Sequence, residues 1–136
     1  MDRNQELEKK ILEIRLLENQ IVQLEQQIGL LNQQVIELQS TQADLDTIQG
    51  VKEQEALVPL GKDIFIRSKL EPANKVLINI GAKVVIKKDI AGAKKILEKQ
   101  KQRFLNAREE IGAEIDNMLS RIATIEKGIK EESEAN

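Results

Sequence analysis

The chain has 136 residues and is nearly neutral, with 23 acidic and 21 basic side chains, and it contains two Phe but no Trp, Tyr, Cys or His. Without Cys or His it cannot form a zinc finger, a Cys nucleophile or a Ser-His-Asp triad. A composition of 32% charged and 40% apolar residues with almost no aromatics indicates long helices that bury narrow apolar stripes.

Residues 5–50 are expected to form a long coiled-coil helix. Apolar residues recur every seven positions, and a Leu follows three positions later in most repeats; the two sets are Leu7, Ile14, Ile21, Ile28 and Val35, and Leu17, Leu24, Leu31, Leu38 and Leu45. β-branched residues at one seam position and Leu at the other are typical of a coiled coil. Gln42 and Gln49 interrupt the first set, and Gly50 is expected to end the helix.

In residues 51–88 the side-chain pattern repeats every two residues instead of every seven, and many of these residues are β-branched, which predicts strands. Turn signals at 61–63, 71–74 and 81–82 divide this stretch into four short strands near 56–60, 64–70, 75–80 and 83–88, paired as two hairpins. Pro59 has no amide hydrogen to donate, so its strand is expected to lie at an edge or to carry a bulge.

Residues 89–132 are expected to form a second coiled-coil helix, with Asp89 as its N-cap. One seam position recurs every seven residues and holds Leu97, Phe104, Ile111, Met118 and Ile125. The other position holds Ile115, Ile122 and Ile129, but the corresponding earlier places hold Lys94, Lys101 and Arg108. This seam is therefore expected to be cleanest in its C-terminal half. The acidic residues 133–136 are expected to be a frayed tail.

The two helices match in length, so folding back on each other buries both seams. The expected fold is α+β, a long antiparallel two-helix coiled coil with two β-hairpins inserted at the bend, in one domain over residues 1–136. Both termini would then lie at the far tip. A sheet of about 30 residues is too small to be stable alone. Its apolar faces and edges are therefore expected to pair with other subunits, through residues Val58, Leu60, Phe65, Ile66, Val76, Ile78, Ile80, Val84 and Ile86.

The sequence contains no catalytic constellation, so no enzyme activity, cofactor or metal is predicted. Its glycines match neither a P-loop nor a dinucleotide-binding loop. Paired carboxylates such as Glu109 and Glu110 are expected to be solvated coiled-coil faces. Residues 51–88 carry eight bases and four acids, a net charge of +4. Such lysines can contact nucleic-acid phosphates, but we favour a role in keeping strand edges soluble, and no nucleic-acid partner is expected.

Apolar residues near the two chain ends form a candidate binding surface. The candidates are Leu7, Ile11, Ile14, Leu16, Ile122, Ile125 and Ile129. If partly exposed, they would bind other apolar chains without sequence preference. From periodicity alone it stays equally open that they only complete the seam of the helical hairpin. The sequence has neither a signal-peptide pattern nor a run of about 18 apolar residues, so a cytoplasmic protein without membrane contact is expected.

Four segments of the middle region match a family pattern. They are the Ala-Leu-Val-Pro-Leu-Gly run at 56–61, Phe-Ile at 65–66, the Lys-Val-Leu-Ile-Asn-Ile-Gly-Ala run at 75–82 and the Val-Val-Ile-Lys-Lys run at 84–88. With the order helix, two hairpins, helix, they resemble the prefoldin family, and the second hairpin resembles its α-type subunits. Two departures from the pattern are Lys62-Asp63 after Gly61 and Lys83 where a second glycine is common.

The resemblance implies a hetero-hexamer of two α-type and four β-type subunits, with the sheets assembled into a β-barrel platform. It further implies an ATP-independent holdase that captures non-native proteins at its coiled-coil tips and passes them to a group II chaperonin. The alternative is a structural coiled-coil scaffold, or a homo-oligomer that forms filaments by pairing of sheet edges.

Overall fold

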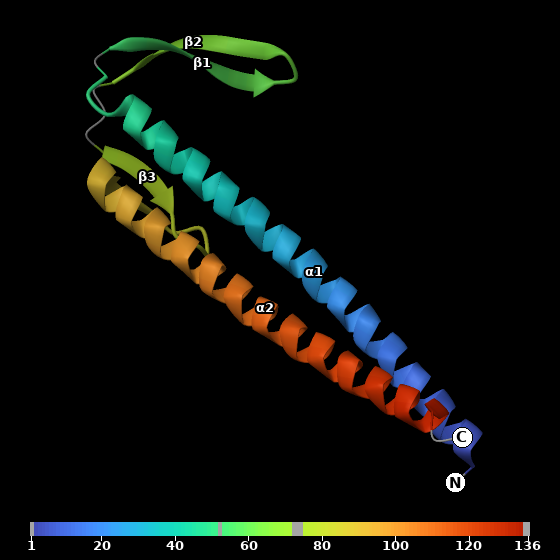
Figure 1. Cartoon of the computed structure of the whole chain (residues 1–136). Coiled ribbons are helices and arrows are strands. Elements are labelled where there is room, and N and C mark those ends of the chain that lie inside the picture. Colours follow the sequence, from blue (N-terminus) through green and yellow to red (C-terminus); the bar gives the residue numbers. More distant parts are fainter. Residues whose placement is uncertain (1, 52, 72–74, 135–136) are drawn as a thin grey trace. The chain divides into compact units, whose positions relative to one another are not determined.

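A computed structural model describes residues 2–51, 53–71 and 75–134 (Figure 1). The elements are, in chain order, α1 (Arg3–Ile48), β1 (Gln54–Gly61), β2 (Ile64–Leu70), β3 (Lys75–Asn79), β4 (Val85–Asp89) and α2 (Ile90–Glu134). The predicted α+β arrangement of two long helices with two β-hairpins between them is confirmed. α1 lies two residues earlier than expected at both ends, and α2 continues through Ser133 and Glu134.

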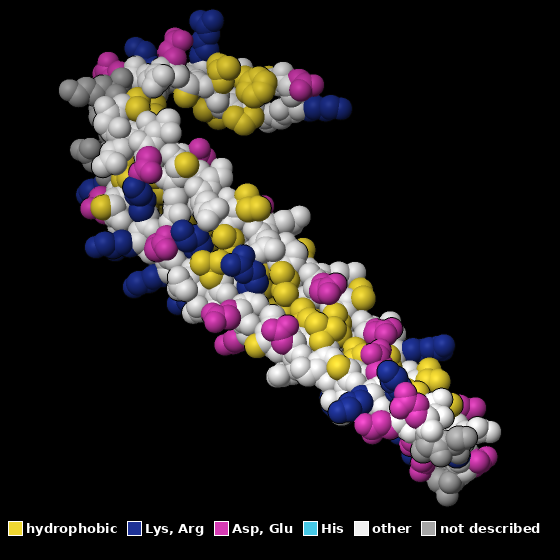
Figure 2. Space-filling model, viewed as in Figure 1, with side chains coloured by type: hydrophobic (Ala, Val, Ile, Leu, Met, Phe, Trp, Pro, Cys, Tyr) yellow, Lys and Arg dark blue, Asp and Glu magenta, His cyan; other side chains and the backbone are white. Residues whose placement is uncertain are grey.

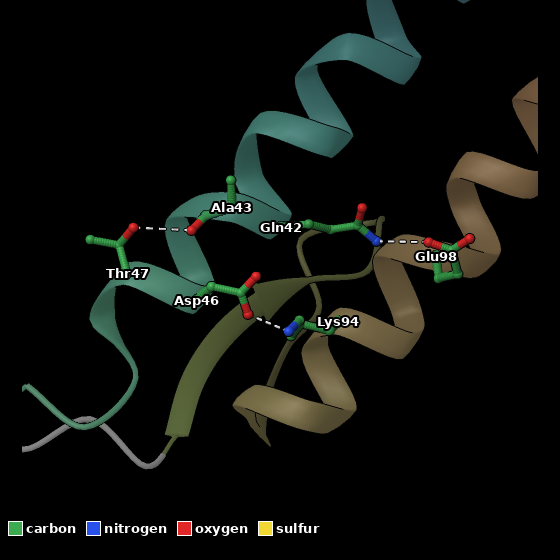
Figure 3. A network of polar contacts seen from close by, with 6 residues as sticks. All are labelled: Gln42, Ala43, Asp46, Thr47, Lys94 and Glu98. Carbon is green, nitrogen blue, oxygen red and sulfur yellow. Dashed lines mark hydrogen bonds and ion pairs between the residues drawn. The ribbon is translucent and has the colours of Figure 1, made fainter.

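The chain divides into two compact units. Unit 1 combines Met1–Val35 with Arg103–Asn136, and unit 2 is Ile36–Gln102. Within unit 1, Glu13 pairs with Arg121 and Asn32 with Arg108. Because rising numbers in α1 meet falling numbers in α2, the two helices are antiparallel there. The Gln42–Glu98 and Asp46–Lys94 contacts indicate the same direction within unit 2 (Figure 3).

The core of unit 1 is the predicted coiled-coil seam. Leu17, Ile21, Ile115 and Ile122 are buried. Partly buried neighbours complete the cluster: Ile14, Leu24, Ile28, Ile111, Met118 and Ile125. Burying an aliphatic side chain of this size stabilises a fold by about 1.5–3 kcal/mol. This stripe, contributed equally by both helices, therefore holds unit 1 together.

The seam of α2 differs from the sequence expectation before Ile111. Ala107 is half-buried, whereas the expected seam residue Arg108 is exposed and its guanidinium donates to Asn32 Oδ1 at 2.8 Å. In unit 2, Ala93 is 1% exposed and takes the place expected for Lys94. The inward positions 107, 111 and 115 are therefore spaced four and four, whereas the expected positions 108, 111 and 115 are spaced three and four. Two successive spacings of four are a stutter, which locally unwinds a coiled coil.

The helix ends follow the predicted capping signals. The Asp89 carboxylate accepts a hydrogen bond from the backbone N–H of Gly92 at 2.8 Å, which confirms Asp89 as the N-cap of α2. After α1, Gly50 has a φ of 79°, a left-handed conformation that glycine adopts without strain. The backbone N–H of Val51 then donates to the carbonyl of Ile48 at 3.2 Å, which closes the last turn.

The hairpins form two separate two-stranded antiparallel sheets, β1-β2 and β3-β4. In the first, Val58 pairs with Ile66 and Pro59 with Phe65, and the register shifts between Pro59 and Gly61. Because both strands of a two-stranded sheet are edge strands, β1 has the edge position that was one of the two alternatives predicted for the strand of Pro59. In the second sheet, Ile78 pairs with Ile86. The turn predicted at 71–74 falls mostly outside the described residues.

The last strand begins later than predicted, at Val85 instead of residue 83. The chain turns between Ile80 and Val84, where the N–H of Ile80 donates to the Val84 carbonyl at 2.9 Å. Ala82 and Lys83 both have positive φ, at 50° and 62°. Residues in this conformation cannot continue a strand, so the turn includes Lys83, and the predicted strand positions Lys83 and Val84 lie before β4.

Unit 2 has its own core, in which β3 packs against the helices. Leu45, Ile90 and Ala93 are buried. Partly buried side chains surround them: Ile48, Val76, Ile78 and Leu97. Polar contacts flank this core, since the Gln42 amide donates to Glu98 at 3.0 Å and Lys94 forms an ion pair with Asp46 (Figure 3). Within unit 2, one face of the second hairpin is thus part of the chain's own packing.

Candidate functional site

Apolar side chains are exposed near the end of unit 1 that holds Arg3 and Glu132, which we call the tip. Of the seven predicted residues, Ile11 is 41% and Leu16 is 55% exposed. Leu12 is 58% exposed and was not predicted. Its signal was present in the sequence, because it is an aliphatic residue outside both seam positions. Together these three side chains provide the accessible apolar surface of α1 near the tip.

The other five predicted tip residues lie deeper. Ile122 is buried, and Ile14 and Ile125 pack against the same cluster, so all three serve the seam in this structure. Leu7 and Ile129 line a cavity of about 430 Å³ together with polar residues of both helix ends: Arg3, Asn4, Glu132 and Ser133. The predicted set thus contains exposed residues, cavity-lining residues and seam residues.

Three polar contacts join the helices near the tip. Lys10 Nζ lies 2.7 Å from Glu132 Oε1, and Arg3 donates to the Glu132 backbone carbonyl at 3.0 Å. Arg121 lies 3.0 Å from a carboxylate oxygen of Glu13. Partly exposed pairs of this kind contribute about 0–1 kcal/mol each. They orient the helix ends, while the apolar seam supplies most of the stability.

The β1-β2 hairpin exposes apolar side chains on both of its faces. Leu57 and Phe65 lie on one face, and Val58 and Ile66 lie on the other, because successive residues alternate across a strand. All four are at least 47% exposed, as are Leu60 and Ile64 near the turn. Figure 2 shows hydrophobic side chains gathered on the visible face of this hairpin. Among the described residues, no β1 or β2 side chain belongs to either buried cluster.

The β3-β4 hairpin places its predicted assembly residues differently. Val76 and Ile78 pack on the core of unit 2, and Ile86 is half-buried. Ile80 and Val84, at the turn, are 51% and 49% exposed. The opposite face exposes two residues that were not predicted: Leu77, at 70%, and Val85, at 55%. Both are apolar residues on the face where a strict alternation would place polar ones. This departure from the alternation is the sequence signal that could have identified them.

Among the described residues there is no group of three or more His, Cys, Asp or Glu side chains that could hold a metal ion. The hydrogen bond from the Gln42 amide, assisted by Lys101, holds the pKa of the Glu98 carboxyl below its usual value. Glu98 is exposed, so this is the signature of a surface contact. In the same part of the chain, no helix is apolar and long enough to cross a membrane.

Comparison with known proteins relates the whole architecture to one family. The family model described as prefoldin subunit matches residues 17–135. The chain is 30% identical over 102 residues to the prefoldin subunit alpha of Methanobrevibacter smithii, covering 75% of this chain and 70% of that protein. It is 26% identical over 130 residues to the prefoldin subunit alpha of Pyrococcus horikoshii, covering 94% and 88% of the two chains.

A solved structure has the same fold. The filamentous PFD from Methanocaldococcus jannaschii, solved by cryo-electron microscopy, superimposes with a TM-score of 0.78 at 23% identity, over 85% of this chain and 97% of that chain. The family match spans both helices and both hairpins, and the archaeal relatives agree on the subunit type. The chain therefore belongs to the prefoldin family of non-enzymatic chaperones, as an alpha subunit.

Proposed function

We propose that this alpha subunit works as an ATP-independent holdase in the cytoplasm. In this proposal it assembles with β-type subunits, two α with four β, and its tips capture non-native proteins for transfer to a group II chaperonin. The observation that carries the capture step is the exposure of Ile11, Leu12 and Leu16 at the tip. Exposed aliphatic side chains without directional polar partners bind apolar segments of many sequences.

The assembly step rests on the β1-β2 hairpin. A two-stranded hairpin is marginally stable in water, and this one leaves Leu57, Phe65, Val58 and Ile66 uncovered on its two faces. Pairing with hairpins of neighbouring subunits would cover both faces and join the strand edges. Several tips on one assembled platform would then bind one client together, with avidity well above that of each weak contact.

The test is suppression of aggregation by the complex of this chain with its β-type partner. The tip variant carries Ile11→Gln, Leu12→Gln and Leu16→Gln, and light scattering follows a thermally unfolding client such as citrate synthase. We expect the wild-type complex to suppress the scattering and the tip variant to lose most of this effect. Glutamine keeps the helix propensity of these positions, so the coiled coil itself should persist.

A matched control separates the tip from general surface hydrophobicity. Val22 and Ile36 are 51% and 63% exposed but lie further along α1. The Val22→Gln and Ile36→Gln variant should protect the client like the wild type. Equal protection by the tip variant and the wild type would overturn the capture step.

A second candidate function is a filament-forming homo-oligomer. It is favoured by the two uncovered faces of β1-β2, because a contact that does not close into a ring propagates as a filament. The related PFD from Methanocaldococcus jannaschii is described as filamentous. Mass measurement of the chain alone and with a β-type subunit distinguishes the candidates. A discrete hexamer formed only with the partner supports the holdase, and long homopolymers support the filament.

A further inference from the structure

The helix α1 carries a second apolar stripe outside its seam. Its members are aliphatic side chains that are more than half exposed: Leu16, at 55%, Val22, at 51%, Leu30, at 64%, and Ile36, at 63%. Val22 and Ile36 share one heptad position, and Leu16 and Leu30 share another, because each pair is separated by two heptads. Figure 2 shows hydrophobic side chains along the edge of α1 that faces away from α2. This stripe stays exposed in the part of the chain that the structure describes.

The polar residues of this stripe are amides instead of charges. The heptad position between its two apolar rows holds Asn19, Gln26 and Gln33, and all three are exposed. On α2, by contrast, outward positions hold exposed charges such as Glu109 and Asp116. Burying an amide costs far less than burying a charge, and one amide can both donate to and accept from another. The stripe, which we call the outer face of α1, is therefore suited to contact with another helix.

Two charges of opposite sign bound the outer face. Arg15 lies at its N-terminal end and Glu37 at its C-terminal end, and both are exposed. Within residues 2–51, 53–71 and 75–134, neither side chain takes part in an ion pair. Both charges are therefore available to a partner.

The outer face is complementary to its own inverted copy. Pairs of its residues lie equally far on either side of Gln26, by four, ten and eleven residues: Val22 with Leu30, Leu16 with Ile36, and Arg15 with Glu37. Two antiparallel copies centred on Gln26 place all four aliphatic residues opposite one another and each arginine opposite a glutamate. We propose that α1 pairs through this face with α1 of a second copy of the chain, antiparallel and centred on Gln26.

Other alignments of two copies lose these matches. Sliding one copy by seven residues places Leu30 opposite Arg15 and Val22 opposite Gln23. A parallel pair in register places Arg15 against Arg15 and Glu37 against Glu37, and like charges at such sites repel. The antiparallel alignment on Gln26 is therefore favoured by both the apolar and the charged residues of the face.

The contact from Arg15 to Glu37 is about 33 Å long at 1.5 Å per residue. Beyond it, Glu8 faces Asp44 in the same alignment, and this repulsion limits the contact to the outer face. In the proposed holdase the coiled coils extend in one direction from a shared platform, so an antiparallel partner comes from a second complex. The inference thus goes beyond the proposed function, since it joins two complexes without using the tip residues.

The test uses the absence of Cys from the chain. Gln26→Cys, Asn19→Cys and Gln33→Cys are each assembled with the β-type subunit and oxidised, and non-reducing electrophoresis measures covalent dimers of this chain. Helices packed about 10 Å apart bring facing Cα atoms to about 5.5 Å, within disulfide range. Because Gln26 faces itself, Gln26→Cys should form about ten times more dimer than either other variant alone. A mixture of the Asn19→Cys and Gln33→Cys complexes should dimerise nearly as well.

Sedimentation velocity over a range of concentrations measures pairing without a cross-link. Val22→Gln with Ile36→Gln removes four apolar side chains from each pair of helices and should raise the dissociation constant by about tenfold or more. This variant should still protect the client. Leu119→Gln is the matched control, because Leu119 is 50% exposed but lies on α2, and it should leave the dissociation constant unchanged.

The charged ends allow a rescue experiment. Arg15→Glu places two acids at each end of the contact and should raise the dissociation constant by about threefold. Adding Glu37→Arg in the same chain exchanges the two charges and should restore the original value. Loss of pairing without rescue would contradict the antiparallel alignment, because that alignment places these two positions opposite each other.

Three outcomes would overturn the pairing. One is an equal yield of dimer from all three single Cys variants, which indicates parallel pairing or random collision. Another is an unchanged dissociation constant in the Val22→Gln and Ile36→Gln variant. The third is loss of client protection by that variant with its pairing intact, which would assign the outer face to clients. The same Cys variants of the chain without its β-type partner report the contact separately, so failure of the hexamer is distinguishable from failure of the pairing.

Discussion

The two hairpins of this subunit are similar in sequence character and different in packing. Each is a two-stranded antiparallel sheet with β-branched and aliphatic residues on both strands. In β3-β4, Val76 and Ile78 pack against Leu45, Ile90 and Ala93. In β1-β2, the paired residues Val58 and Ile66 are both about half exposed. An apolar strand pattern thus shows that a face must be covered, but not which surface covers it.

The largest expected effect comes from changing β1-β2. Leu57→Gln with Phe65→Gln should abolish the complex with β-type subunits, because it makes one uncovered face polar. The free energy of unfolding of the isolated chain should change by less than about 0.5 kcal/mol, as at exposed sites generally. Light scattering after size-exclusion chromatography gives the masses. A hexamer of normal stability from this variant would show that this face is not used in assembly.

For the core beneath β3-β4, we expect a change in the stability of the isolated chain. Ile90 is 4% exposed in the core of unit 2, so Ile90→Ala should lower the free energy of unfolding by roughly 3 kcal/mol through lost contacts and a cavity. Urea denaturation of the isolated chain measures it. The paired control is Ile64→Ala at the β1-β2 turn, where a 61% exposed side chain should have little effect. Similar losses in both variants would remove the distinction between the hairpins.

The turns of the two hairpins allow a smaller test. Lys83 has a φ of 62°, in the region that favours glycine, and Lys83→Gly should stabilise the chain by about 0.5 kcal/mol. Asp63, in the β1-β2 turn, has a φ of 60°, but aspartate tolerates this conformation better than lysine. Asp63→Gly should therefore gain less. Thermal unfolding ranks the two variants, and a destabilised Lys83→Gly variant would contradict the expected backbone strain.

The smallest effect concerns Glu98 in unit 2. Its pKa is lowered chiefly by the hydrogen bond from Gln42, so the contact stabilises the fold above the usual glutamate pKa of about 4.3 and is lost as the pH falls through the lower folded value. Gln42→Ala should raise the Glu98 pKa towards its usual value. NMR titration of the side-chain carboxyl measures this directly. An unchanged Glu98 pKa in the variant would assign the shift to Lys101 instead.

Much of the architecture followed from local patterns. The heptad repeats placed both helices within two residues of their ends, because a sustained seam has one period and the caps at Asp89 and Gly50 have local chemistry. Pro59 predicted an edge strand or a bulge because proline lacks an amide hydrogen, and β1 is an edge strand whose register shifts after Pro59. The residues at 56–61 and 75–88 were also enough to indicate the family, before any contact was known.

Tertiary structure decided what periodicity treats as equivalent. A heptad pattern does not distinguish Ala107 from Arg108 as the inward residue at a stutter, because that choice depends on how the opposing helix fits against each side chain. The heptad pattern also treats Leu7 and Ile14 as equivalent, but Ile14 packs against the core of unit 1, whereas Leu7 lines the cavity at the helix ends. The tertiary structure also decided that β3-β4 packs on the core of unit 2 while β1-β2 stays exposed. The sequence of an apolar strand does not specify which surface covers it, because burial depends on which surfaces meet.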